Sequence, residues 1–461
     1  MLNSPRRTRP GRAQAGPGPR TGALAAALCA ALLLAGSAAP ALAAAPGAPG
    51  GTADAGAQAT AASAPGGTAA FGGTAAVGGT AADAARPGRG ALVSHTLLYT
   101  LEKPGDVATW LTDAEFDPGT VRYGVDAYRL VYRTVDPHGR PTTASGLLVL
   151  PRGHEGRLRP VSFTHGTGVH KDDSPSMKTG GFLPAPPVTY ASAGYAAVAP
   201  DYLGMGLGPG PHPWMDVPSE TTASLDMLRA ARAFVSGTGR TLDRDVAVTG
   251  FSQGASAALG LARALESGED RRFRLGALAP VSGAYDFGGA ELPALLAGEL
   301  EPKSSVLYAA YTLVAFNRLH HLYDSPEEVF QGPYADTIEA LFDGTHTGPE
   351  LMAGTPATLD ELLTGPGREL LADPAGPMAA ALRTTDDVCD WAPRAPVRLY
   401  LARDDEQATV ANTAHCRAAF ARHGVAAPVV DLGAVDYHGS RHLGSNVRAT
   451  TAVVRWLDSL R

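Results

Sequence analysis

The sequence predicts an α/β fold in which a mostly parallel β-sheet carries helices on both faces. Three observations predict it. From residue 91 onward, short β-rich runs alternate with helical patterns. Most of these runs are apolar and bounded by Gly, Pro or Asp, as expected of strands covered on both faces. In addition, one of these runs is followed by a serine between two glycines, and an amphipathic segment begins directly after it. At 461 residues the chain is long for one domain, so we expect segments in addition to this core.

Residues 1–43 are typical of an export signal. A basic start is followed by an apolar stretch at residues 23–35 and then by small residues ending in Ala41-Leu42-Ala43. The apolar stretch is shorter than the ~20 residues that a membrane span needs. We therefore expect cleavage close to Ala43, a secreted protein, and no stable membrane span in the mature chain.

Residues 44–90 are rich in Ala, Gly and Thr and repeat the unit Gly-Gly-Thr-Ala-Ala three times. Such a segment has almost nothing to bury against the entropy cost of ordering it. We expect a disordered linker here and a folded domain over residues 91–461.

The folded domain begins with two runs that suit an antiparallel edge of the sheet, Val125–Thr134 and Ala144–Leu150. Six apolar runs are expected buried strands: Pro160–Thr164, Tyr195–Pro200, Val246–Thr249, Leu275–Val281, Val397–Leu401 and Pro428–Leu432. Four amphipathic segments between them are expected helices: Glu220–Val235, Gln253–Glu266, Asn412–Arg422 and Asn446–Leu460.

The stretch at about 288–386 interrupts this alternation. It holds helix-like segments and no convincing strand, and it is too long for an ordinary loop. We expect a helical cap over the carboxyl edge of the sheet. Its apolar residues suit either its own core or a substrate-lining surface.

The strongest motif is Gly250-Phe-Ser252-Gln-Gly254, placed after one expected strand and before one expected helix. A nucleophile elbow needs this arrangement, because the glycines permit a tight turn that exposes the serine hydroxyl. The alternative is a serine that merely caps the helix. The context predicts Ser252 as a nucleophile.

A glycine-flanked loop, His165-Gly-Thr-Gly168, follows the strand ending at Thr164. An oxyanion intermediate requires two main-chain N–H groups, one after the nucleophile and one from such a loop. We predict Gln253 and Thr167 as the donors, with Gly166 as the neighbouring option. His165 is interpreted as a packing residue.

A serine nucleophile needs a histidine base and a carboxylate that orients it, and after this type of elbow the acid precedes the histidine along the chain. The segment after Leu401 contains Asp404 and Asp405, and the segment before the last helix contains His438 and His442. The pattern alone leaves both choices open.

With these motifs the chain resembles the α/β-hydrolase superfamily, and within it the secreted lipase-like esterases. The resemblance rests on Thr164–Thr167, the segment Ala199–Gly206, the elbow, and Pro280–Asp286. The acid loop of the family, placed on residues 402–412, implies Asp405 as the acid. Ala402, Ala408 and Thr409 depart from its pattern, so Asp404 stays an alternative. The small residues that follow His442 imply this histidine as the base.

These motifs together predict hydrolysis of a carboxylic ester through an acyl-enzyme on Ser252, with a small-molecule or lipid ester as the substrate. No metal-binding or nucleotide-binding motif is present, so we expect neither a metal nor an organic cofactor. The net charge of −7 and the lack of a basic stripe in the folded part argue against nucleic acid as a partner. A secreted peptidase or acyltransferase is the alternative, and a catalytically dead binding module is a further one.

Two cysteines, Cys389 and Cys416, remain after removal of the signal segment. Disulfides persist outside the cell. We predict a bridge between them that braces the turn holding Asp405, the alternative being two buried free thiols.

Overall fold

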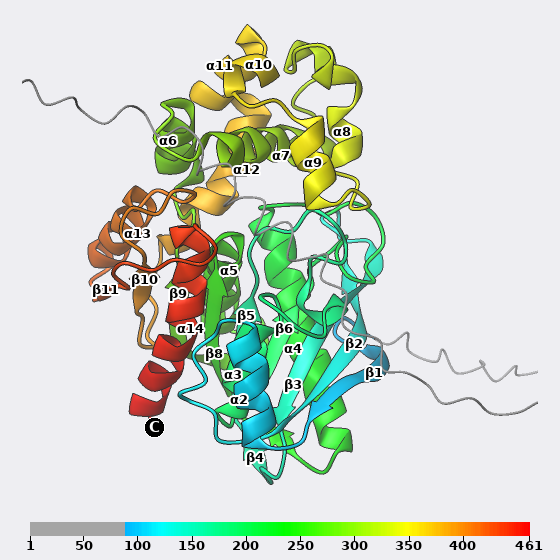
Figure 1. Cartoon of the computed structure of the whole chain (residues 1–461), viewed down its shortest axis with the longest axis vertical. Coiled ribbons are helices and arrows are strands. Elements are labelled where there is room, and N and C mark those ends of the chain that lie inside the picture. The colour runs from blue at the N-terminus through cyan, green and yellow to red at the C-terminus, as the bar shows by residue number, and fades with distance from the viewer. Residues whose placement is uncertain (1–87) are drawn as a thin grey trace, which may run out of the picture.

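The computed structural model describes residues 88–461, and its centre is a nine-stranded sheet (Figure 1). The predicted signal segment, and the predicted linker up to residue 87, lie outside the described residues. The strand order is β1-β2-β3-β6-β5-β8-β9-β10-β11. Three strands at one edge pair antiparallel with their neighbours: β1 (Leu92–Leu101), β2 (Val125–Val135) and β3 (Pro141–Pro151).

The other six strands run parallel to one another: β5 (Pro160–Thr164), β6 (Ala196–Pro200), β8 (Asp245–Phe251), β9 (Arg274–Val281), β10 (Leu399–Leu401) and β11 (Val429–Asp431). A separate two-stranded pair joins β4 (Arg157–Leu158) to β7 (Thr241–Leu242). In the parallel part, Thr164 of β5 lies opposite Gly250 of β8. This register places the loop after β5 beside the elbow after β8.

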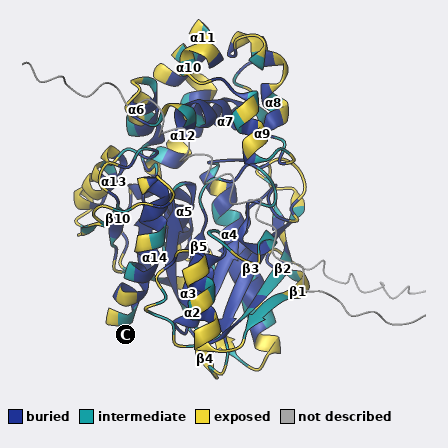
Figure 2. Ribbon diagram, viewed as in Figure 1, coloured by how far each residue is buried: buried dark blue, intermediate teal, exposed yellow. Residues whose placement is uncertain are grey.

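Helices cover both faces of the sheet. One face carries α4 (Val217–Gly237), α5 (Gln253–Ser267) and α13 (Ala411–Arg422), and the other carries α2 (Pro104–Asp113), α3 (Ala185–Ser192) and α14 (Arg441–Ser459). Each set packs apolar side chains onto the strands in its own core cluster. The buried residues are concentrated in the sheet and in the inner sides of these helices (Figure 2).

A layer of helices lies over one end of the sheet (Figure 1). Its members are α6 (Leu292–Leu296), α7 (Pro302–His320), α8 (Ile338–Leu341), α9 (Gly348–Gly354), α10 (Leu359–Leu362), α11 (Gly365–Ala372) and α12 (Gly376–Asp386). A short π-helical turn, η2 (Phe287–Glu291), leads into it. The layer has its own apolar core, centred on α7. We call this layer the cap.

Several elements differ from the sequence-based expectation. The strand β1, the short pair β4 and β7, and the helices α2 and α3 were not predicted. β1 is an edge strand whose side chains are exposed or half-buried, so it lacks a strong apolar pattern. Helix α14 begins at Arg441, five residues before the predicted start at Asn446. Its first turn is polar and is defined by a cap, because the Ser440 hydroxyl accepts a hydrogen bond from the N–H of Leu443.

Candidate active site

Ser252 occupies a strained turn between β8 and α5. Its φ of 57° and ψ of −125° lie in a region that non-glycine residues rarely adopt. The flanking glycines are required by close packing: a Cβ on Gly250 would lie 2.1 Å from the carbonyl oxygen of Gly254, and a Cβ on Gly254 would lie 2.1 Å from that of Thr164. Although Ser252 stands at the N-cap position of α5, its side chain makes no capping hydrogen bond. The strained turn instead directs the hydroxyl outward.

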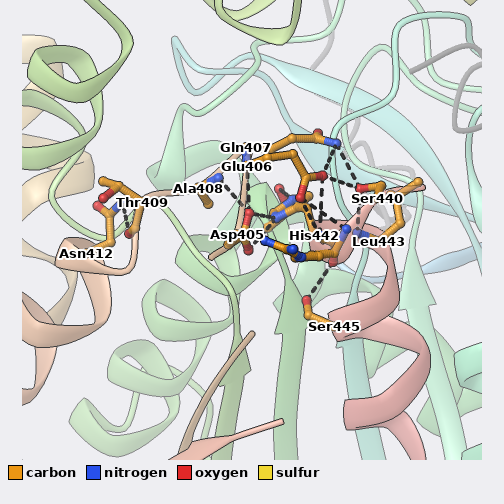
Figure 3. A network of polar contacts seen from close by, with 12 residues as sticks. Asp405, Glu406, Gln407, Ala408, Thr409, Asn412, Ser440, His442, Leu443 and Ser445 are labelled. Atoms are coloured by element: carbon orange, nitrogen blue, oxygen red, sulfur yellow. Dashed lines mark hydrogen bonds and ion pairs between the residues drawn. The ribbon is translucent and has the colours of Figure 1, made fainter. Parts of the chain in front are cut away.

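The Ser252 hydroxyl meets a buried histidine and a buried carboxylate. Its Oγ lies 2.8 Å from Nε2 of His442. The Nδ1 of His442 lies 3.0 Å and 2.9 Å from the two carboxylate oxygens of Asp405 (Figure 3). Because a carboxylate only accepts hydrogen bonds, Nδ1 carries the proton, and the unprotonated Nε2 accepts from the serine. The structure thus brings the three predicted residues into one hydrogen-bonded chain.

The surroundings of His442 set its proton affinity. Its side chain is almost fully buried, and burial alone would lower the pKa. The charge and hydrogen bond of Asp405, with a smaller contribution from the Glu406 carboxylate, outweigh burial and hold the pKa of His442 above its usual range. The site therefore favours the imidazolium that forms when His442 takes the serine proton.

The alternative residues of both predicted pairs lie elsewhere. The side chain of Asp404 is 70% exposed and faces Arg441 at 3.6 Å. Nε2 of His438 pairs with a carboxylate oxygen of Glu115 at 2.8 Å, on the surface. Neither residue contacts the serine or its histidine.

A second layer of hydrogen bonds holds the acid loop against the start of α14 (Figure 3). The N–H groups of Gln407 and Ala408 both donate to Oδ1 of Asp405 at 3.0 Å. The Glu406 carboxylate accepts from the Ser440 hydroxyl and from the N–H of Arg441. The sequence reasoning missed Glu406 and Ser440. A serine directly before a helix is a capping signal that could have pointed to Ser440.

Glu291, at the end of η2, is a further buried acid that the sequence did not indicate. Its Oε2 accepts from Nδ2 of Asn412 at 2.6 Å and from the N–H of Thr409 at 3.1 Å. Burial raises the pKa of Glu291 to about 8. This residue therefore ties the base of the cap to the acid loop as a largely neutral carboxylic acid at pH 7.

The predicted oxyanion donors flank the serine. Thr167 follows β5 and Gln253 is the first residue of α5, where a helix leaves its N–H groups without helical partners. Over residues 88–461, neither of these N–H groups donates to another main-chain oxygen. The neighbouring Gly166 also faces the same cavity, so both loop candidates remain next to the serine. His165 lies buried with its ring on Tyr202, at a centroid distance of 4.4 Å, as a packing residue would.

Two buried side chains hold the Gln253 side chain by hydrogen bonds. Its Nε2 donates to Oε1 of Glu220 at 2.6 Å and to Nε2 of His212 at 2.9 Å. Burial raises the pKa of Glu220 to about 8 and lowers the pKa of His212 to about 3. Both groups are therefore mainly uncharged at neutral pH. Through the Gln253 side chain, this neutral hydrogen-bonded network anchors the first turn of α5.

An apolar cavity of about 120 Å³ opens at Ser252. Its apolar lining comes from the loops below and from the cap helix α7, and includes Phe182, Leu183, Phe251, Leu307, Tyr308 and Tyr311. Further along α7, Leu313, Val314 and Phe316 lie in the core of the cap. Both expected uses of the cap's apolar residues therefore occur, on different side chains.

A disulfide joins Cys389 to Cys416. Cys389 ends the short turn after the cap, and Cys416 lies on α13, the helix that follows the acid loop. The predicted bridge is confirmed. It ties the return from the cap to the helix that follows the acid loop.

Comparison with known proteins places this fold among esterases and lipases. No family model and no curated protein sequence matches the chain. The structure is similar to that of the rice cell wall degrading esterase LipA from Xanthomonas oryzae, with a TM-score of 0.72 and 25% identity, over 81% of this chain and 100% of that one. It is also similar to Candida antarctica lipase A, with a TM-score of 0.54 and 16% identity, over 75% of this chain and 76% of that one.

These similarities confirm the α/β-hydrolase fold and the resemblance to lipase-like esterases. The similarity to LipA, matched over its whole length, confirms the predicted class of enzyme, an ester hydrolase. Within residues 88–461 the structure contains no helix that combines the length and the apolar character of a membrane span.

Proposed function

We propose that this protein is a secreted serine hydrolase that cleaves carboxylic esters through an acyl-enzyme on Ser252. The observation that carries the proposal is the hydrogen-bonded chain from Ser252 through His442 to Asp405, placed where the strained elbow meets an apolar cavity. Such a chain activates a serine that is otherwise a weak nucleophile.

The first half-reaction forms the acyl-enzyme. Nε2 of His442 takes the proton as Oγ of Ser252 attacks the ester carbonyl, and Asp405 stabilises the resulting imidazolium. The N–H groups of Gln253 and Thr167 hold the oxyanion of the tetrahedral intermediate. Its collapse breaks the ester bond, and His442 returns the proton to the leaving alcohol.

The second half-reaction releases the acid. His442 now takes a proton from water, which attacks the acyl carbonyl and forms a second oxyanion in the same position. Its collapse regenerates the Ser252 hydroxyl with the proton held by His442. No step requires a metal or an organic cofactor.

The acyl group of the substrate occupies the apolar cavity beside Ser252 in this proposal. Because α7 roofs this cavity, we expect short and medium acyl chains to be preferred over long ones. A series of p-nitrophenyl esters from acetate to palmitate tests this expectation. A large preference for palmitate over butyrate would contradict it, and faster cleavage of peptide amides than of esters would favour a peptidase.

Labelling with a fluorophosphonate tests the nucleophile. We expect one covalent adduct, located on Ser252 by mass spectrometry, and loss of both label and ester turnover in Ser252→Ala. Ser267→Ala, at the far end of α5, is the matched control and should keep both. An adduct elsewhere, or turnover retained by Ser252→Ala, would exclude the mechanism.

Export is part of the proposal and rests on the pattern of residues 1–43. Expression of the full chain in a bacterial host with a compatible export system should yield protein in the medium. Its N-terminus, read by mass spectrometry, should lie close to Ala43. Retention of the intact N-terminus inside the cells would argue against secretion.

A further inference from the structure

The side chain of Thr167 has a hydrogen-bonding arrangement that the mechanism above does not use. Nε1 of Trp214 donates to Oγ1 of Thr167 at 3.0 Å. An indole N–H can only donate, so the threonine oxygen is the acceptor in this contact. The hydroxyl proton of Thr167 must therefore point to a different partner.

No protein group takes this proton in the described part of the chain. Trp214 is the one hydrogen-bond partner of Oγ1 recorded over residues 88–461. Thr167 is half-buried and lines the same cavity as Ser252. The hydroxyl thus accepts one hydrogen bond from Trp214 and keeps its own proton free to donate to a group bound in the cavity.

Trp214 is itself held in a fixed orientation by the cap. Its ring stacks on two tyrosines of α7, at centroid distances of 6.1 Å to Tyr308 and 4.7 Å to Tyr311, with interplanar angles of 11° and 9°. It is 2% exposed. The hydroxyl of Tyr311 donates to the carbonyl of Gly168, next to Thr167. These ring contacts and the near-complete burial of the indole hold its N–H toward the threonine oxygen.

We propose that the Thr167 hydroxyl is a catalytic residue, a third donor to the oxyanion beside the N–H groups of Thr167 and Gln253, and that Trp214 is the positioning residue that orients it. The inference rests on the proposed ester hydrolysis. The hydroxyl keeps its proton throughout, and it strengthens its hydrogen bond as negative charge develops on the carbonyl oxygen.

The side-chain role of Thr167 is tested with Thr167→Val, which has nearly the same shape but no hydroxyl and retains the main-chain N–H. Loss of one oxyanion donor typically costs about 10²- to 10³-fold in kcat. We expect a loss of about this size, with KM changed by less than about threefold, because the substrate carbonyl carries little charge before attack. Thr167→Ser, which restores a hydroxyl, should recover most of kcat.

An inhibitor that mimics the intermediate separates this role from a structural one. A trifluoromethyl ketone forms a hemiketal oxyanion with the serine, so its affinity should fall in Thr167→Val in parallel with kcat/KM. The matched control is Thr189→Val, which removes another buried threonine hydroxyl on α3, away from the cavity, and should leave the affinity unchanged. Thermal melting curves verify that each variant is folded.

The positioning role is tested with Trp214→Phe, which keeps an aromatic ring in the stack and removes the N–H. We expect about a tenfold loss of kcat in the wild-type background and no further loss in the Thr167→Val background, since the two residues act through one contact. Trp391→Phe removes a comparable buried indole N–H beside Phe420 and serves as the control.

The outcomes distinguish this inference from the proposed function. If Ser252→Ala abolishes turnover while Thr167→Val keeps kcat within about twofold of wild type, the third donor is excluded and the serine mechanism stands. If the losses in Thr167→Val and Trp214→Phe simply multiply, Trp214 does not act through the threonine hydroxyl. If the wild-type protein cleaves no ester, the proposed function itself fails.

Discussion

Replacing Asp405 with asparagine separates the charge of the acid from its geometry. An asparagine oxygen can still accept from the N–H groups of Gln407 and Ala408, so the acid loop should keep its shape. The carboxylate that fixes the proton on Nδ1 of His442 is lost, and the side-chain amide favours the wrong tautomer. The same exchange in a well-studied serine protease triad lowers kcat by about 10⁴. We expect a similar loss here, equivalent to ~5.4 kcal/mol of transition-state stabilisation.

The same variant should shift the pH dependence. His442 acts as a base only when neutral, so wild-type kcat/KM falls as the pH drops through its raised pKa. In Asp405→Asn, burial is no longer offset by the nearest carboxylate, and the pKa of His442 falls. The acid limb of the residual activity should therefore move to lower pH than in the wild type.

The measurement is kcat/KM for p-nitrophenyl butyrate from about pH 4 to about pH 9, for wild type, Asp405→Asn and the control Asp404→Asn. Asp404 has a positive φ of 57°, which asparagine tolerates, and an exposed side chain, so its variant should behave as wild type. Asp405→Asn with more than about a tenth of wild-type kcat, or an equal loss in Asp404→Asn, would refute the assignment of the acid.

Three further predictions follow from single contacts. His442→Ala should lower kcat by several orders of magnitude, whereas His438→Ala, a surface change, should cost less than about tenfold; the reverse result would move the base to His438. The bridge closes a loop between cysteines 27 residues apart, so the double variant Cys389→Ser/Cys416→Ser should be less stable by on the order of 3 kcal/mol and should melt at a lower Tm. An unchanged Tm would show that the bridge does not contribute to stability. The folded protein keeps the Glu291 proton up to about pH 8, while the unfolded chain releases it near 4.5, so wild-type stability falls as the pH rises through this window. The Tm of Glu291→Gln relative to wild type should therefore rise from about pH 5 to about pH 8, and a constant difference would contradict the raised pKa.

The sheet and the elbow could be predicted because their signals are local. A buried parallel strand is a short apolar run, and the glycines around Ser252 are needed by contacts within the turn and with the adjacent strand. The edge strand β1 and the first turn of α14 escaped prediction, because neither has a strong apolar pattern. The predictions of export and of a linker concern residues outside the described part of the chain and stay predictions.

The choice within each candidate pair depended on the tertiary structure. Asp404 and Asp405 are adjacent, and sequence cannot tell which carboxylate turns inward. In the fold, Asp404 adopts a positive φ and its side chain is exposed, while Asp405 is directed at His442. The start of α14 decides between the histidines in the same way, because His442 lies in its first turn above the serine and His438 lies in the surface loop before it.

The sequence alone determined the fold class, the elbow serine, the loop that flanks it and the pair of cysteines. The first three depend on residues close together in the chain, and the cysteines are too few to allow another pairing. The tertiary structure decided which groups surround those residues. Trp214 meets Thr167 across 47 positions, and Glu291 meets Asn412 across 121 positions. Contacts over such separations leave no periodic or local trace, because the physical interaction exists only once the cap and the strands have packed together.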